Sequence, residues 1–186
     1  NTNEAQTPQC RRTNRSKLRL EELEAREVPA LTITFDFGYD TSGFFNDVNR
    51  RNILQQAANE VAARLDAGFH GLAPSGGNTW TASFFNPSTG ATQYVANRTI
   101  QANQIIIYAG ARDLPGNQAA VGGYGGWSSS GDAYWNTLVQ QRGVGGDFAT
   151  WGGSISFDTN GTPWSFSSTS AVPTGTVDFY SVVQHE

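Results

Sequence analysis

The sequence has almost none of the chemistry that cross-links small extracellular proteins. Its 186 residues contain one cysteine, Cys10, and no methionine. A single cysteine cannot form an internal disulfide, and a structural zinc site built from cysteines is excluded as well. The fold must therefore be held by a hydrophobic core, for which this length is sufficient. Since position 1 is not methionine, we expect the chain to be a piece of a longer one.

Charge is also scarce. Charged residues make up 15% of the chain, the net charge is −4 and the pI is about 5.1, which argues against a nucleic-acid binder. No apolar run approaches the roughly 18 residues of a membrane span, so we expect none. The 21 glycines and an aromatic content of 12% are typical of an extracellular protein rich in strands and loops.

Residues 1–30 form a charged leader. They hold half of the 12 basic residues and no apolar h-region of the roughly 7–15 residues that a conventional signal peptide needs. One interpretation is a disordered leader with a short helical turn. The other rests on residues 20–30, LEELEAREVPA, which resemble the LExLExRxxPA segment at the start of many large exported proteins of environmental bacteria. That resemblance implies a secreted or cell-surface location.

Hydrophobic periodicity predicts a mixed α+β domain over residues 31–186. Alternating apolar residues predict strands at 31–37 and 79–85, and the apolar run at 105–108 predicts a strand buried on both faces. An apolar stripe predicts an amphipathic helix that begins after Asn46 or Asp47, includes Leu65 and is closed by Gly68. We expect this helix to pack on one face of a mixed, twisted sheet.

The second half of the chain predicts a loop, a short helix and another strand. Residues 109–126 are interpreted as an extended, glycine-rich loop. We do not expect it to bind a nucleotide, because no Lys and Ser/Thr follow the glycines as a phosphate-binding loop requires. A helix is predicted at 132–142 and a strand at 152–158. The tryptophans are better explained as core and loop anchors than as a platform for stacking sugars; they are Trp80, Trp127, Trp135, Trp151 and Trp164.

The last ten residues predict the start of a helix. Phe179, Val182, Val183 and Glu186 share one helical face, and Thr176 is the expected N-cap. No Gly, Pro or basic residue ends this helix, so we expect it to continue in a longer parent chain. Its final pair, His185-Glu186, is the first half of H-E-x-x-H, in which two histidines bind zinc and the glutamate acts as a base.

The order of several motifs resembles matrixin-type metzincin zinc peptidases of an exported bacterial group. The C-terminal part reads GSISFD at 153–158, then Trp164, then FYSVVQHE at 179–186. Two earlier segments also resemble this group: DFGYDTSGFF at 36–45 and GARDL at 110–114. The resemblance spans residues 31–186 and implies a zincin-like upper subdomain whose C-terminus is the start of the active-site helix.

The resemblance also implies residue roles. His185 would be the first zinc ligand and Glu186 the general base, while the remaining zinc ligands would lie beyond Glu186. A peptide substrate would lie along a sheet edge. The candidate edges are 121–127 and 153–157, and the candidate substrate-binding residues are Gly153, Ser154, Ile155 and Ser156. We therefore expect the chain by itself neither to bind zinc tightly nor to hydrolyse peptides.

Other interpretations stay open. His185 could be an ordinary surface histidine of a frayed turn. Related peptidases often carry calcium, and four aspartates near Gly or Asn are its candidate ligands, with turn capping as the alternative: Asp113, Asp132, Asp147 and Asp158. The whole domain could also be a non-catalytic, β-rich adhesion or carbohydrate-binding module of a surface protein, which the composition fits equally well.

Overall fold

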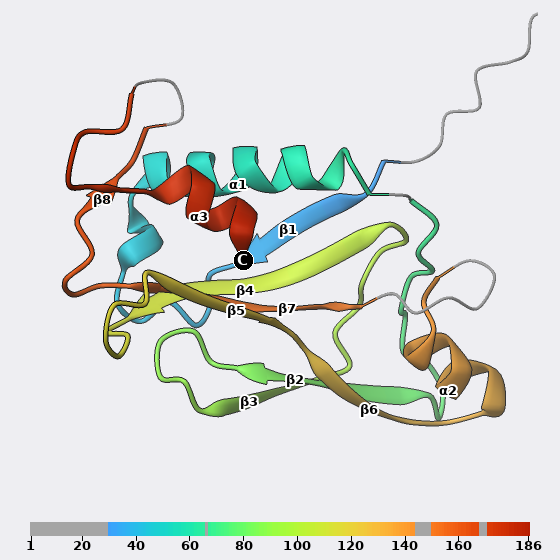
Figure 1. Cartoon of the computed structure of the whole chain (residues 1–186). Coiled ribbons are helices and arrows are strands. Elements are labelled where there is room, and N and C mark those ends of the chain that lie inside the picture. Colours follow the sequence, from blue (N-terminus) through green and yellow to red (C-terminus); the bar gives the residue numbers. More distant parts are fainter. Residues whose placement is uncertain (1–29, 66, 144–149, 168–170) are drawn as a thin grey trace, which may run out of the picture.

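The protein has a mixed α+β architecture, as predicted. The computed structural model describes residues 30–65, 67–143, 150–167 and 171–186, so the predicted leader lies outside the described residues except for Ala30. Two β-layers lie one above the other, and helices cover the outer face of the larger one (Figure 1). In these residues no helix has the length and apolar character needed to cross a membrane.

The main sheet has four strands, and parallel and antiparallel pairs are mixed within it. Its order is β1 (Thr32–Asp36), β4 (Gln104–Arg112), β7 (Gly152–Asp158) and β5 (Ala120–Tyr124). The pairs β1–β4 and β4–β7 are parallel, and the pair β5–β7 is antiparallel. β7 therefore lies inside the sheet, and β5 is an edge strand.

Two glycines at the start of β7 permit this arrangement. A Cβ on Gly152 would lie 1.8 Å from the carbonyl oxygen of Ile106 on β4, and one on Gly153 would lie 2.0 Å from that of Gly123 on β5. Gly152 also has φ +147°, which L side chains rarely adopt. A side chain at either position would push β7 away from a neighbouring strand.

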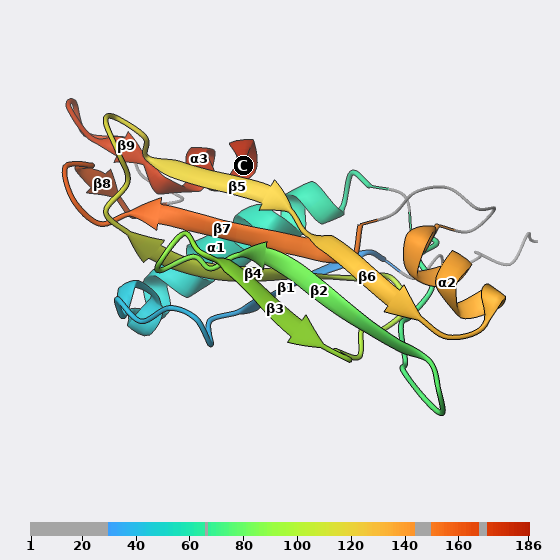
Figure 2. The ribbon, with the colours of Figure 1, turned by 90° about the horizontal axis from the view of Figure 1, so that it is seen from below.

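A smaller antiparallel sheet packs beneath the main one. Its order is β3 (Thr92–Ala96), β2 (Thr79–Phe85) and β6 (Gly126–Ser130). Only Gly125 separates β5 from β6, so one extended segment forms an edge of both sheets, as Figure 2 shows. Buried aromatic rings fill the space between the layers: Trp80, Phe84, Tyr108, Trp135 and Trp151. Three of the five tryptophans are thus core anchors, as predicted.

Helix α1 (Val48–Ala62) packs on the opposite face of the main sheet. The side chain of Asp47 caps it by accepting a hydrogen bond from the backbone N–H of Asn49 (2.8 Å). The predicted C-terminus was wrong. The helix ends at Ala62, Gly68 lies outside it, and Leu65 is 47% exposed rather than part of the apolar stripe.

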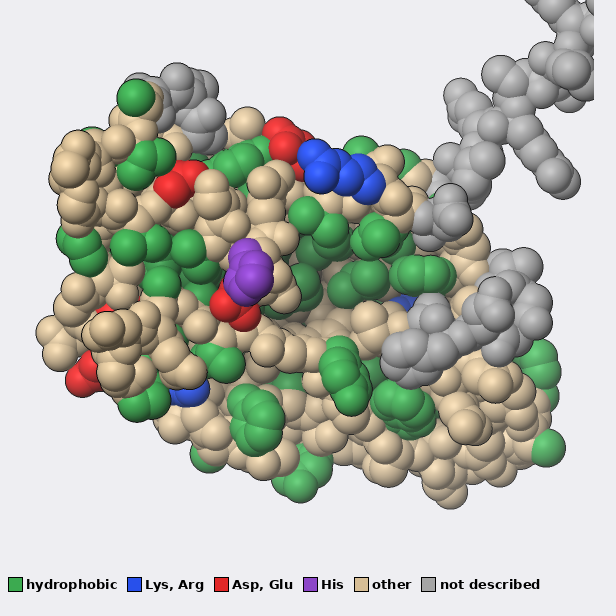
Figure 3. Space-filling view, in the orientation of Figure 1, with side chains coloured by type: hydrophobic (Ala, Val, Ile, Leu, Met, Phe, Trp, Pro, Cys, Tyr) green, Lys and Arg blue, Asp and Glu red, His purple; other side chains and the backbone are tan. Residues whose placement is uncertain are grey.

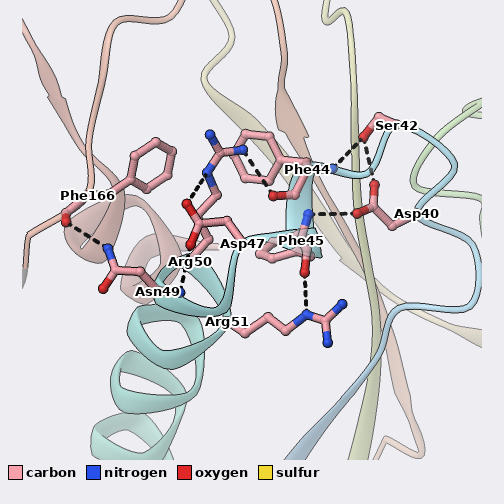
Figure 4. A network of polar contacts seen from close by, with 9 residues as sticks. All are labelled: Asp40, Ser42, Phe44, Phe45, Asp47, Asn49, Arg50, Arg51 and Phe166. Carbon is pink, nitrogen blue, oxygen red and sulfur yellow. Dashed lines mark hydrogen bonds and ion pairs between the residues drawn. The ribbon is translucent and has the colours of Figure 1, made fainter.

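Hydrogen bonds of charged side chains fix the connection from β1 to α1 (Figure 4). It includes the short 3-10 helix η1 (Phe44–Asn46). The carboxylate of Asp40 accepts from Ser42 Oγ (2.7 Å) and from the backbone N–H of Phe45 (2.8 Å). The guanidinium of Arg50 donates to the carbonyl of Phe44 (3.0 Å) and lies over its ring. These contacts hold Phe44 and Phe45 in the core.

The remaining elements are short. They are α2 (Ala133–Gln140), β8 (Trp164–Ser165), β9 (Val177–Asp178) and α3 (Phe179–His185). α2 and α3 lie where helices were predicted. The predicted cap of the last helix was wrong, because Asp178, not Thr176, accepts the hydrogen bond from the backbone N–H of Ser181 (3.2 Å).

The interpretation of residues 109–126 as a loop was wrong except for residues 113–119 and Gly125, which form neither helix nor strand. β4 continues to Arg112, and residues 120–124 form β5. β3 was also missed. Glycine and small residues give β5 almost no alternation of buried and exposed side chains, so periodicity could not detect it. Both strands lie at sheet edges, where few side chains have to be apolar.

Arg142 is a completely buried cation held by carbonyl oxygens. Its guanidinium donates to the carbonyls of His70 (2.9 Å), Thr150 (3.1 Å), Gln101 (3.3 Å) and Gln104 (3.0 Å). Desolvation lowers the pKa of Arg142 to about 10, so the burial has a cost that these four charge-assisted bonds offset. The side chain joins the segments that lead into β4 and β7.

We expect Arg142→Met to destabilise the protein by about 3 to 5 kcal/mol, because four carbonyl oxygens that surround a buried side chain lose their charged donor. Urea unfolding followed by tryptophan fluorescence measures this free energy. Arg64→Met is the matched control, since Arg64 is exposed. A loss of less than about 1 kcal/mol for Arg142→Met, equal to the control, would contradict the assignment.

Candidate functional site

Helix α3 ends at His185, Glu186 follows as its C-cap residue, and Phe179 fixes the start of the helix. The ring of Phe179 is fully buried, and its centroid lies 4.7 Å from that of Phe157 on β7 and 5.4 Å from that of Trp164. Phe44 and Phe166 lie 6.0 and 5.1 Å from it. Rings at these separations attract one another beyond their burial. The first turn of α3 therefore has a fixed place at the end of β7.

The next turn of α3 packs against α1. Val183 is buried in the same core as Leu54 of α1. On the surface above it, Gln184 Nε2 donates to Glu60 Oε2 (3.1 Å). With one face held by α1 and its start held by Phe179, the helix directs its last residues toward the free edge of the main sheet.

Glu186 meets that edge. Its Oε2 accepts a hydrogen bond from the backbone N–H of Gly122 on β5, at 2.7 Å. A Cβ on Gly122 would lie 3.1 Å from this oxygen and 3.3 Å from the Cβ of Glu186, so the absence of a side chain permits the close approach. This bond connects residues 64 apart in the sequence and holds the predicted catalytic carboxylate on an edge strand.

The free backbone groups of β5 follow from this bond. Backbone N–H and C=O groups alternate in direction along a strand. Since the N–H of Gly122 points away from β7, the backbone N–H and C=O groups of Ala120 and Tyr124 point the same way. Those of the intervening residues pair with β7. The bonds from Asp158 N–H to Ala119 and from Gly125 N–H to Gly152 agree with this alternation. Within the described residues no other strand pairs with this side of β5, so the backbone groups of Ala120 and Tyr124 offer donors and acceptors on either side of the Gly122–Glu186 bond.

A groove of about 270 Å³ lies next to Glu186 on the α1 side of the main sheet. Figure 3 shows this face hollowed and lined by hydrophobic side chains. The β5 residues 122–124 and Glu186 form one side of the groove. Its apolar lining comes from α1 and the strands, and includes Leu54, Ala58, Val61, Ile33, Ile107 and Ile155.

The predicted substrate-binding residues divide into two sets. Gly153, Ser154 and Ile155 line the groove together with Glu186. Ser156 does not, because it is buried on the other face, where its Oγ donates to the carbonyl of Pro87 (2.6 Å). Of the two candidate edges, β7 was the wrong one: its backbone pairs with β4 and β5, so it has no free groups for strand addition.

The described residues do not complete a zinc site. His185 is exposed in the last turn of α3, and His70 is elsewhere, in the segment whose backbone bonds to Arg142. A catalytic zinc needs three protein ligands. Within residues 30–65, 67–143, 150–167 and 171–186, no three His, Cys, Asp or Glu side chains gather as a metal site requires.

Two of the aspartates considered for calcium hold turns or helix starts. Asp132 caps α2, accepting from Trp135 N–H (2.7 Å). Asp158, which is 2% exposed, accepts from the backbone N–H groups of Leu114 (3.0 Å) and Thr162 (3.0 Å) and from Thr162 Oγ1 (2.7 Å). Asp113 is exposed, and Asp147 lies outside the described residues.

Comparison of the chain with protein-family models, with curated proteins and with solved structures gave no match.

The hydrogen bonds to Asp158 have a consequence for pH dependence. Burial by itself would raise the pKa of this carboxyl, but the bonds from Leu114, Thr162 and Asn160 outweigh it and lower the pKa. The stabilisation is therefore present above the unfolded-state pKa, near 3.9, and is lost as pH falls through the lower folded-state pKa.

We expect Asp158→Asn to destabilise the protein by about 2 kcal/mol at pH 7, because an amide nitrogen must face N–H donors. The difference from the wild type should shrink below about pH 4, where the Asp158 carboxyl of the unfolded chain becomes protonated before that of the folded protein. Urea unfolding between pH 3 and 8 measures it, with Asp113→Asn as the exposed control. A difference that stays constant down to pH 3 would show that the carboxylate's charge is not the cause.

Proposed function

We propose that this chain is the N-terminal part of a secreted or cell-surface zinc-dependent endopeptidase of the matrixin-like metzincin group, with a zincin-like upper subdomain. Its substrate would be a peptide or protein segment in extended conformation. In the parent, His185 would be one zinc ligand, and the others would follow Glu186. The metal would supply the activation of the attacking water.

The observation that carries the proposal is the bond between Glu186 and Gly122. A general base is useful only where the substrate lies within hydrogen-bond reach. An extended peptide could add to β5 through the free backbone groups of Ala120 and Tyr124. Its scissile bond would then pass directly beside the Glu186 carboxylate. The sheet edge and the proposed base are thus within one hydrogen-bond length of each other.

The same bond sets a condition for binding. In the described arrangement the Glu186 carboxylate occupies the N–H of Gly122, which lies between the backbone groups of Ala120 and Tyr124 on this side of β5. A peptide that uses this donor must displace the carboxylate. Its displacement would free Glu186 to accept a proton, so substrate addition and the release of the base would be one event.

The groove supports a continuation of α3. Its apolar lining begins beside Val183 and Glu186 and extends between α1 and β5. In the proposed parent, the turns that follow Glu186 would place their apolar face in this groove and cover it. A second histidine one helical turn after His185 would then lie on the same side as His185.

The test compares two chains from the same gene. We expect its reading frame to encode a histidine three residues after Glu186, completing H-E-x-x-H, and a third imidazole shortly after. The 186-residue chain should show no tight zinc site by titration calorimetry and no cleavage of casein. The longer chain should bind one zinc ion tightly and cleave casein, lose activity to a zinc chelator, and regain it when zinc is added.

Two variants of the longer chain separate the roles. Glu186→Gln should keep tight zinc binding and lose activity by a factor of about 100 or more, because the base is removed and the ligand is kept. His185→Ala should lose both. A tight zinc site with casein hydrolysis in the 186-residue chain, or a parent frame with no second histidine, would overturn the proposal.

A further inference from the structure

The small sheet has one face that no described element covers. Along β2, Trp80, Ala82 and Phe84 are buried toward the main sheet, so the alternate residues point outward. Figure 2, seen from below, shows β2, β3 and β6 in front of the main sheet. Strand register assigns the following residues to the outer face: Thr79, Thr81, Ser83, Phe85, Thr92, Tyr94, Ala96, Ser128 and Ser130. We refer to these nine residues as the hydroxyl face.

The hydroxyl face carries no charge. None of the residues of β2, β3 and β6 is Asp, Glu, Lys or Arg. Six of its nine side chains are Ser or Thr, and among the described residues only that of Thr79 has a hydrogen-bond partner, the carbonyl of Ser130 at 3.4 Å. These hydroxyls can both donate and accept hydrogen bonds. They stand on neighbouring strands about 4.8 Å apart.

Two exposed aromatic rings stand among the hydroxyls. Tyr94 is 65% exposed and Phe85 is 67% exposed. Tyr94 pairs with Ser83, and Phe85 pairs with Thr92, so the two rings are diagonal neighbours on adjacent strands. Such neighbours lie about 7 to 8 Å apart. Two neighbouring exposed rings form a small apolar patch within an otherwise hydroxyl-rich face.

Aromatic packing supports the hydroxyl face from behind. Directly behind the face, Phe84 stacks on Tyr108 of β4 with ring centroids 4.1 Å apart and planes inclined by 5°. Trp80 is anchored by a hydrogen bond from its Nε1 to the carbonyl of Arg98 (2.9 Å). A ligand therefore meets a surface whose backbone is already ordered, and it loses less affinity to ordering the protein.

We propose that the hydroxyl face binds an uncharged polysaccharide chain. A sugar ring has one face of C–H groups, which packs on an aromatic ring, and a rim of hydroxyls, which can pair with Ser and Thr. Nucleic acids and anionic lipids would require basic residues, which β2, β3 and β6 lack. A stable protein interface would have a more apolar centre than six hydroxyl side chains provide.

This inference is independent of the proposed peptidase function. The hydroxyl face is on the opposite side of the main sheet from α1, α3 and the groove (Figures 1 and 2). The nearby tryptophans pack in the core, so a sugar ring would stack on Tyr94 and Phe85 rather than on a tryptophan. In an exported protein such a face would hold the chain on a surface glycan.

The test measures retention of the whole 186-residue chain on insoluble cellulose, chitin, β-1,3-glucan and mannan, with soluble alginate as the anionic comparison. Affinity electrophoresis with hydroxyethyl cellulose gives an apparent Kd. We expect binding to at least one uncharged polysaccharide. Tyr94→Ala should weaken it by about five- to ten-fold, and Tyr94→Phe should stay within about two-fold, because the ring is kept.

Tyr134→Ala is the matched control, since Tyr134 is 75% exposed but lies on α2. It should bind as the wild type does, and circular dichroism should be unchanged in all three variants. The proposal would be overturned if the chain bound none of the uncharged polysaccharides. It would also be overturned if Tyr94→Ala and Tyr134→Ala lost affinity equally. Sedimentation velocity that shows a dimer dissociated by Tyr94→Ala, with no glycan bound, would instead assign the face to self-association.

Discussion

The burial of Phe179 is the constraint on which the site depends. This ring joins the end of β7, the segment around Trp164 and the Phe44–Phe45 turn into one aromatic core, and α3 begins at the same residue. A helix of seven residues has little stability of its own, so tertiary packing must supply it. Because Phe179 fixes where α3 starts and α1 fixes its direction, the position of Glu186 against β5 follows. The structure therefore connects a core aromatic residue directly to the geometry of the proposed base.

The sequence predicted the elements whose two faces differ strongly. β1, β2 and the start of α1 show the alternation or helical stripe that burial on one side imposes, and their positions were predicted to within a few residues. β7 was predicted from the alternation of Ile155 and Phe157 with polar residues, although both of its faces are buried. β5 was not predicted, because its glycines have no side chains that could alternate between buried and exposed. Glycines in this segment matter for a different reason. At Gly122 β5 approaches Glu186, and at Gly125, between β5 and β6, the chain passes Trp151, whose ring would lie 1.9 Å from an added Cβ. Periodicity does not detect a residue selected for close approach.

The candidate site could be predicted only in part. Glu186 and residues 153–155 were identified and lie on one groove. That β5 rather than β7 is the free edge depends on strand order, which is a property of long-range pairing. Arg142 was missed altogether, since a lone arginine in a polar segment gives no sign that four distant carbonyls will surround it. The hydroxyl face likewise becomes visible only when register places three short uncharged strands side by side.

The most direct test of the account is the amide resonance of Gly122 in the 186-residue chain, compared between the wild type and Glu186→Gln at one pH. If α3 holds the Glu186 carboxylate on β5, the amide proton of Gly122 should lie downfield in the wild type and move upfield in Glu186→Gln, while that of Gly123, which pairs with β7, should keep its position. Phe179→Ala, in which the helix loses its anchor, should move the Gly122 resonance in the same direction. A Gly122 resonance that is identical in wild type and Glu186→Gln would show that the carboxylate does not lie on the edge strand.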